Sequence, residues 1–165
     1  MTSHDLLAQF DREMATTRRV LSRVPNALLE WRPHPKSTTM LGIARHLAHM
    51  VTYGPLALTE EASDIASRTP MPVTTSIEAV LEIFDRNVAA VHALLAGQSD
   101  ADLAKPWSLM YQGKAVVAAT REVAIQSMIL HHQIHHRGQL SVYLRLNDVP
   151  VPAIYGPSAD EAMQA

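Results

Sequence analysis

A long stretch without proline, residues 116–146, limits the folds open to this 165-residue chain more than any other part of the sequence. Such a stretch can continue through many helical turns, because every residue in it supplies the backbone donor that proline lacks. It also holds four of the nine histidines, all within residues 131–136. Residues i and i+4 of a helix share one face, so two pairs of imidazoles could each bind one metal ion: His131 with His135, and His132 with His136.

Three further segments repeat apolar residues at helical spacing. Together with the proline-free stretch they predict helices over residues 3–24, 39–61, 76–97 and 117–147. Gly54 and Pro55 mark a point where the second helix could break. Four long amphipathic helices with little strand signal predict an all-α fold, an antiparallel four-helix bundle that forms a single domain over residues 1–165.

The segments between these helices carry loop signals. Residues 63–75 are rich in Pro, Ser and Thr, which predicts a loop. Residues 107–111, followed by Gln112, Gly113 and Lys114, predict either a short hairpin or an extended excursion. Residues 149–157 contain several prolines, so we expect an irregular C-terminal tail.

Composition excludes several classes of protein. Apolar residues make up 47% of the chain and charged residues 18%, which indicates a compact folded protein. The net charge of −2 and the scattered Lys and Arg residues argue against a nucleic-acid surface. The chain has no cysteine, so a transition-metal site must use imidazole and carboxylate. No apolar run suits a membrane span and no basic leader precedes the first helix, so we expect a cytoplasmic protein.

Helical periodicity favours one histidine pair over the other only slightly. The apolar line through Ile125 and Ile129 leads into His132 and His136, which would place this pair toward the core. The rival pair lies on a line that also has apolar members, so both pairs remain candidates. A third ligand could come from the second helix, where His46 lies on the more apolar side and His49 on the more polar side. A histidine-rich surface patch with fortuitous metal affinity is the alternative to a built site.

Three stretches of the sequence carry a resemblance to a known family. They are Trp31-Arg32-Pro33, Ile43-Ala44-Arg45-His46-Leu47 and His132-Gln133-Ile134-His135-His136-Arg137-Gly138-Gln139, and the closing Tyr155-Gly156-Pro157-Ser158-Ala159-Asp160 matches the tails of some members. On these motifs the chain resembles the DinB/YfiT-like superfamily. The resemblance implies a four-helix bundle, often a homodimer, in which His46, His132 and His136 bind one divalent metal ion, nickel or zinc. The Arg-Gly-Gln that follows His136 is what selects this pair over His131 and His135.

The resemblance implies a reaction less firmly than it implies a metal site. Characterised relatives include thiol-dependent transferases that use bacillithiol or mycothiol and a mycothiol-dependent maleylpyruvate isomerase, while other members are named only for induction by DNA damage. We therefore expect a metal-dependent enzyme of the thiol S-transferase or hydrolase type that acts on a small molecule. The alternative is a non-enzymatic stress-response protein in which the ion is structural.

Several residues near the predicted ligands are candidates for supporting roles. Gln139 is close in register to His136, so it could hold the second ring nitrogen of His136 or face the open metal position. Tyr53, seven residues beyond His46, and His49 could line the pocket. For Arg137 we expect an ion pair with an acidic residue rather than substrate binding. The sequence names no catalytic residue beyond the metal ligands.

Overall fold

The computed structural model describes residues 1–67 and 70–162. Its α-helices are α1 (Ser3–Leu21), α2 (Met40–Met50), α3 (Tyr53–Thr59), α4 (Ile77–Ala96), α5 (Asp100–Leu103), α6 (Arg121–Ile125) and α7 (His132–Arg145). Two 3-10 turns, η1 (Asn26–Leu28) and η2 (Ile65–Ser67), and a π-helical turn, η3 (Gln126–His131), complete the helical elements. The strands are β1 (Ala62–Asp64), β2 (Pro106–Tyr111) and β3 (Lys114–Thr120).

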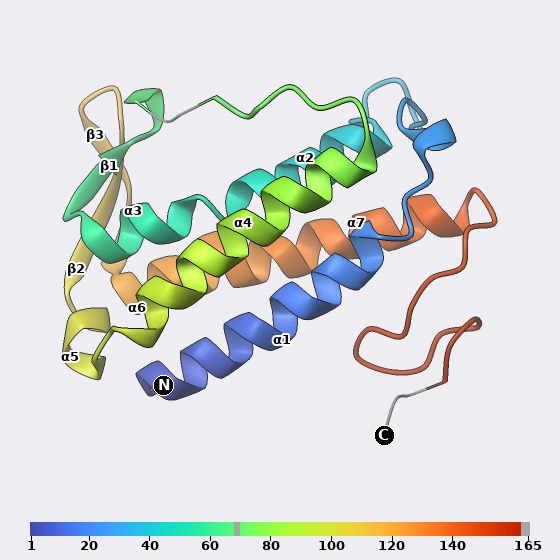
Figure 1. The fold of residues 1–165 in the computed structure, drawn as a ribbon. Helices are drawn as coiled ribbons and strands as arrows, with labels where there is room; N and C mark the ends of the chain where they lie inside the picture. The colour runs from blue at the N-terminus through green and yellow to red at the C-terminus, as the bar shows by residue number, and fades with distance from the viewer. Residues whose placement is uncertain (68–69, 163–165) are drawn as a thin grey trace.

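Four long helical segments lie side by side and form a bundle (Figure 1). Helix α1 contacts α4 and α7, and α2 contacts the same two helices from the opposite side of the bundle. The predicted four-helix bundle is therefore confirmed. Its predicted antiparallel order holds for α1 with α4 and for α2 with α7, but two other contacting pairs run in the same direction, α1 with α7 and α2 with α4 (Figure 1). Helices α2 and α4 can be parallel because residues 70–76, which precede α4, run back along the length of the bundle.

A small sheet at one end of the bundle shows that the predicted all-α class is wrong in the strict sense (Figure 1). Strand β1 pairs in parallel with β2, and β2 pairs antiparallel with β3. Gln112 and Gly113 both have positive φ, 50° and 75°, which is the geometry of a two-residue hairpin turn. The hairpin alternative for this segment is therefore confirmed, and the extended excursion is not formed.

The fourth helical segment begins later than predicted. Residues 114–120 belong to β3, so the helix starts at Arg121 and not near Val117. Thr120 defines the boundary, because its hydroxyl accepts a hydrogen bond from the backbone N–H of Val123 at 3.3 Å. A short apolar run such as Ala115–Ala119 fits either a strand or a buried helical turn, so periodicity could not decide between them.

The second predicted helix is two helices, and the break lies before Gly54. Helix α2 ends at Met50 and α3 begins at Tyr53. Pro55 lies in the first turn of α3, where its missing N–H is tolerated, and it cannot donate to the carbonyl four residues earlier. Gly54 is required for packing, because a Cβ there would lie 2.5 Å from a methyl carbon of Val91 in α4.

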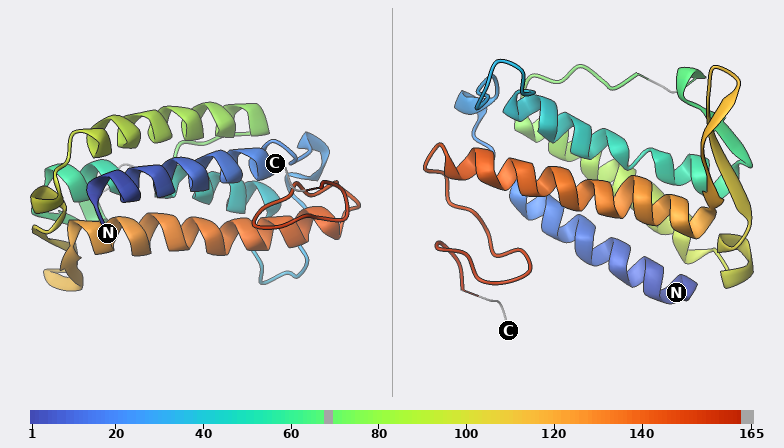
Figure 2. Two further views of the ribbon diagram at one scale, coloured as in Figure 1. Left: turned by 90° about the horizontal axis from the view of Figure 1, so that it is seen from below. Right: turned by 180° about the vertical axis from the view of Figure 1, so that it is seen from behind.

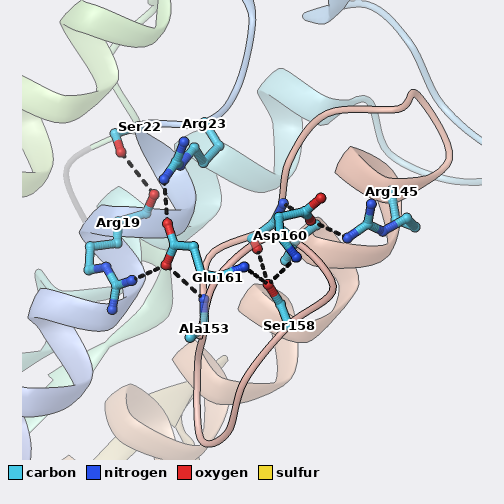
Figure 3. A network of polar contacts seen from close by, with 9 residues as sticks. Arg19, Ser22, Arg23, Arg145, Ala153, Ser158, Asp160 and Glu161 are labelled. Carbon is cyan, nitrogen blue, oxygen red and sulfur yellow. Dashed lines mark hydrogen bonds and ion pairs between the residues drawn. The ribbon is translucent and has the colours of Figure 1, made fainter. Parts of the chain in front are cut away.

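The tail after α7 is irregular in its described residues, as predicted, and ion pairs hold it against the bundle. Glu161 contacts Arg19 of α1 and Arg23 of the turn that follows α1, each at 2.5 Å, and Asp160 pairs with Arg145 of α7 (Figure 3). The tail therefore lies beside α1 and α7 (Figure 2). Among residues 1–67 and 70–162, no helix combines the length and apolar character that a membrane span needs.

Candidate metal centre

Helices α2 and α7 lie side by side (Figure 2) and bring three histidines together. His46 comes from α2, and His132 and His136 come from the first two turns of α7. One ring nitrogen from each histidine lies within 4.8 Å of the other two, and all three side chains are half-buried. Of the histidine pairs and partners left open by periodicity, the structure brings together this set.

The spacing of the three rings suits a single ion. The Nε2 atoms of His46 and His132 are 3.5 Å apart, and the ring centroids of the three histidines are separated by 4.5, 4.7 and 5.2 Å. Imidazole nitrogens bound to one tetrahedral zinc ion at roughly 2.0–2.1 Å lie about 3.4 Å from one another. The group can therefore hold a divalent ion after small side-chain rotations, and three protein ligands leave a further position open.

The protonation state of these histidines also fits a ligand role. The Nδ1–H of His136 donates to the amide oxygen of Gln139 at 2.7 Å, which leaves Nε2 of His136 as the nitrogen with a lone pair. Burial lowers the pKa of His132, and His136 and His135 lower it further. Burial likewise lowers the pKa of His136, against the raising effect of the Gln139 hydrogen bond. Both lowered pKa values favour the neutral form of the ring, which is the form that binds metals.

The register of the histidines on α7 differs from the predicted one. We expected His132 and His136 to continue the buried line of Ile125 and Ile129, but after the π-helical turn the fully buried positions are one residue further on, at Gln133 and Arg137. A π turn accommodates one more residue than an α turn, so the face that points to the core shifts along the sequence. The histidines lie beside the core line, at the border with solvent. No periodicity in the sequence signals this turn.

Arg137 has the structural role that we expected, but at a buried position. Its guanidinium is 1% exposed and pairs with Glu13 of α1 at 2.7 Å. It also donates to the hydroxyl of Tyr155 in the tail at 2.7 Å and to Thr17 at 3.3 Å. The arginine of the His-Arg-Gly-Gln motif therefore joins α7 to α1 and to the tail, away from α2.

The remaining candidate residues lie outside the three-histidine group. His131 at the end of η3 and His135 in α7 are both exposed, although the ring of His135 contacts that of His136 at a centroid distance of 4.7 Å. Tyr53 is half-buried and packs on the core from α3.

His49 faces another cavity. It lines a pocket of about 400 Å³ whose wall also includes Thr52, Leu56, Glu60, Ile83 and Asn87. None of the three grouped histidines lines this pocket. His49 therefore lies on the α4 side of α2, in a pocket separate from the three grouped histidines, and a role for it beside the predicted ligands stays a prediction.

The comparisons with known proteins agree with the family that the sequence motifs indicate. The family model of the DinB superfamily matches residues 9–140, which include His46, His132 and His136. The chain belongs to the DinB superfamily. The family predicted from the motifs is therefore confirmed, although the closing residues 155–160 lie beyond the matched segment.

This DinB chain is similar to several proteins of Bacillus species. The uncharacterized protein YrdA of Bacillus subtilis (strain 168) is 24% identical over 164 residues, covering 97% of this chain and 92% of YrdA. A DinB-like protein of Bacillus cereus ATCC 10987 has a TM-score of 0.70 at 22% identity, covering 93% of this chain and 98% of that one.

Two further solved structures are from Bacillus subtilis. The DinB-like protein YjoA has a TM-score of 0.71 at 14% identity, covering 89% of this chain and 96% of YjoA. YfiT has a TM-score of 0.68 at 15% identity, covering 90% of this chain and 89% of YfiT. YfiT is described as a probable metal-dependent hydrolase with an unusual four-helix bundle topology. At these identities the likeness establishes the fold of the DinB chain.

Proposed function

We propose that this DinB chain is a metal-dependent enzyme whose ligands are His46, His132 and His136. The observation that carries the proposal is the convergence of three ring nitrogens, from two helices, within 4.8 Å of one another. An all-imidazole set suits nickel or zinc, the two ions that we expect. The description of YfiT as a probable metal-dependent hydrolase supports the same reading.

The side chains around the group prepare it for one function, which is to present neutral nitrogens to an ion. Gln139 keeps a proton on Nδ1 of His136, so that Nε2 of this ring is the nitrogen that binds. The chemistry that a divalent ion supplies in a three-imidazole site is Lewis acidity, which lowers the pKa of a water or thiol at the remaining position. We assign no general base among the described residues.

Two reaction classes follow from this site, hydrolysis and transfer of a low-molecular-weight thiol to an electrophile. The printed description of YfiT favours hydrolysis, and we place it first. Thiol transfer is the second candidate because the family that the motifs resemble includes thiol-dependent transferases. The chain has no cysteine, so the nucleophilic sulfur would come from a small-molecule cosubstrate. We further propose that the protein acts as a homodimer in the cytoplasm.

Metal analysis of protein purified without an affinity tag tests the ligand set. We expect about one divalent ion per chain in the wild type and its loss in His46→Ala, His132→Ala and His136→Ala. His131→Ala and His135→Ala are matched controls, because these exposed histidines lie on the same helical segment and should leave the metal content unchanged. Unchanged metal content in all three ligand variants would contradict the proposal.

An activity screen separates an enzyme from a protein with a structural ion. The zinc- and nickel-loaded proteins are assayed with generic esters and, separately, with several low-molecular-weight thiols and 1-chloro-2,4-dinitrobenzene. Turnover that disappears in His132→Ala supports the enzyme. Absence of turnover, together with a coordination shell that X-ray absorption shows to be closed by protein ligands, would favour the structural ion.

A further inference from the structure

The C-terminal end of α2 lies inside the bundle, where its last carbonyls need partners other than the next helical turn. The last four carbonyl groups of a helix lack intrahelical donors. In this protein two of them accept hydrogen bonds from side-chain amides of the flanking helices. The amide of Gln133 in α7 donates to the carbonyl of Leu47 at 2.6 Å, and that of Asn87 in α4 donates to the carbonyl of Ala48 at 3.0 Å.

The Gln133 bond joins the two helices at the level of the three histidines. Gln133 directly follows His132, and Leu47 directly follows His46. The bond thus connects the chain neighbours of two grouped histidines across the α2–α7 interface. The Gln133 side chain is fully buried, which makes the bond inaccessible to competing water.

Stability alone does not explain an amide at this position. The side-chain oxygen of Gln133 is buried and has no hydrogen-bond partner among the described residues. A buried polar atom without a partner is unfavourable, and an apolar side chain of the same length would avoid it. The benefit of glutamine must therefore lie in the donor group, which holds the end of α2.

We propose that Gln133 is a positioning residue, which holds α2 at the separation from α7 at which His46 meets His132 and His136. The inference rests on the metal site proposed above. Asn87 provides a matched comparison, because it makes the same type of bond to the next carbonyl but from α4. Loss of the Asn87 bond loosens the same helix end without releasing α2 from α7.

Cobalt(II) binding followed by visible absorption tests this role, since both affinity and band intensity depend on ligand geometry. In Gln133→Met we expect the dissociation constant to rise by about ten-fold or more, as for other residues that orient ligands, and the absorption bands to change. In Asn87→Leu we expect both to stay at the wild-type value. Urea unfolding of both metal-free variants reports the general loosening of α2.

The results of these experiments separate an error in the role of Gln133 from an error in the metal site. Wild-type affinity and spectrum in Gln133→Met, or equal changes in Gln133→Met and Asn87→Leu, would overturn the positioning role. If Gln133→Met does not fold, Gln133→Asn replaces it, because its shorter amide cannot reach Leu47, and the same expectations apply. If His132→Ala also keeps wild-type cobalt binding, the metal site itself is wrong and not only the role of Gln133.

Discussion

The neighbouring residues His136 and Arg137 lie on two different faces of α7 and differ in burial and in their partners. On one face Arg137 is 1% exposed and has its partners inside the protein, with Glu13, Thr17 and Tyr155 all within hydrogen-bond distance. On the other face His136 is half-buried, and its ring faces two more rings. A buried charge must be paired within the fold, whereas neutral imidazoles at a border can converge on each other. The Arg137 contacts are satisfied within the protein, whereas the three histidines are suited to binding an added ion.

The largest effect should come from breaking the Arg137 face. Arg137→Met leaves the carboxylate of Glu13 buried without its cation, and we expect a loss of about 3–5 kcal/mol in the free energy of unfolding. Urea denaturation at neutral pH measures it. The double variant Glu13→Leu/Arg137→Met should recover most of the loss, since no unpaired charge remains. A single-variant loss below about 1 kcal/mol would show that the pair contributes little.

The three grouped histidines should affect the free energy of unfolding mainly when a metal ion is bound. Zinc at about 100 times its dissociation constant should raise the free energy of unfolding by about 2.7 kcal/mol in the wild type. His46→Ala should lose this gain, while His131→Ala should retain it. Urea denaturation with zinc and with chelator gives both values. A zinc-dependent gain that survives in His46→Ala would place the ion elsewhere.

A smaller effect is expected from Tyr155 in the tail, which contacts the Arg137 face of α7. The hydroxyl of Tyr155 donates to Glu13 at 2.8 Å and accepts from Arg137. Tyr155→Phe removes both bonds, and we expect a cost of about 1 kcal/mol in unfolding free energy because the ring itself is mostly exposed. Cobalt affinity should not change, since the tail lies on the α1 side of α7. A weakened cobalt site in Tyr155→Phe would show that the two faces are coupled.

The smallest effect should be a pH dependence of the metal-free protein. Burial lowers the pKa of His132 and His136 in the folded state, so the unfolded chain takes up protons first as the pH falls. Stability from these groups is therefore complete above about pH 6.5 and is lost as the pH falls through the folded-state pKa values. Urea denaturation in chelator at a series of pH values measures it. The double variant His132→Gln/His136→Gln should show a flatter profile, and an unchanged slope would assign the effect to other groups.

Much of the fold followed from local patterns. The helical spacing of apolar residues predicted the four segments of the bundle, and a hairpin turn at Gln112 and Gly113 was one of two predicted alternatives. The start of α6 and the parallel order of α2 and α4 did not follow, because both depend on partners distant in sequence. Residues 114–120 form a strand because they pair with β2. The direction of α4 depends on a long connection whose course no local signal describes.

The candidate site divides in the same way. The residue types and the i, i+4 spacing of the histidines, together with the family motif, were enough to nominate His46, His132 and His136 and to suggest Gln139 as the partner of His136. Gln133 could not be found, because its importance depends on where α2 ends and on which face of α7 points to α2. Both are set by packing, through the break before Gly54 and the π-helical turn before His132. Chemistry and spacing are local properties of a chain, whereas register between helices is settled only when their side chains pack.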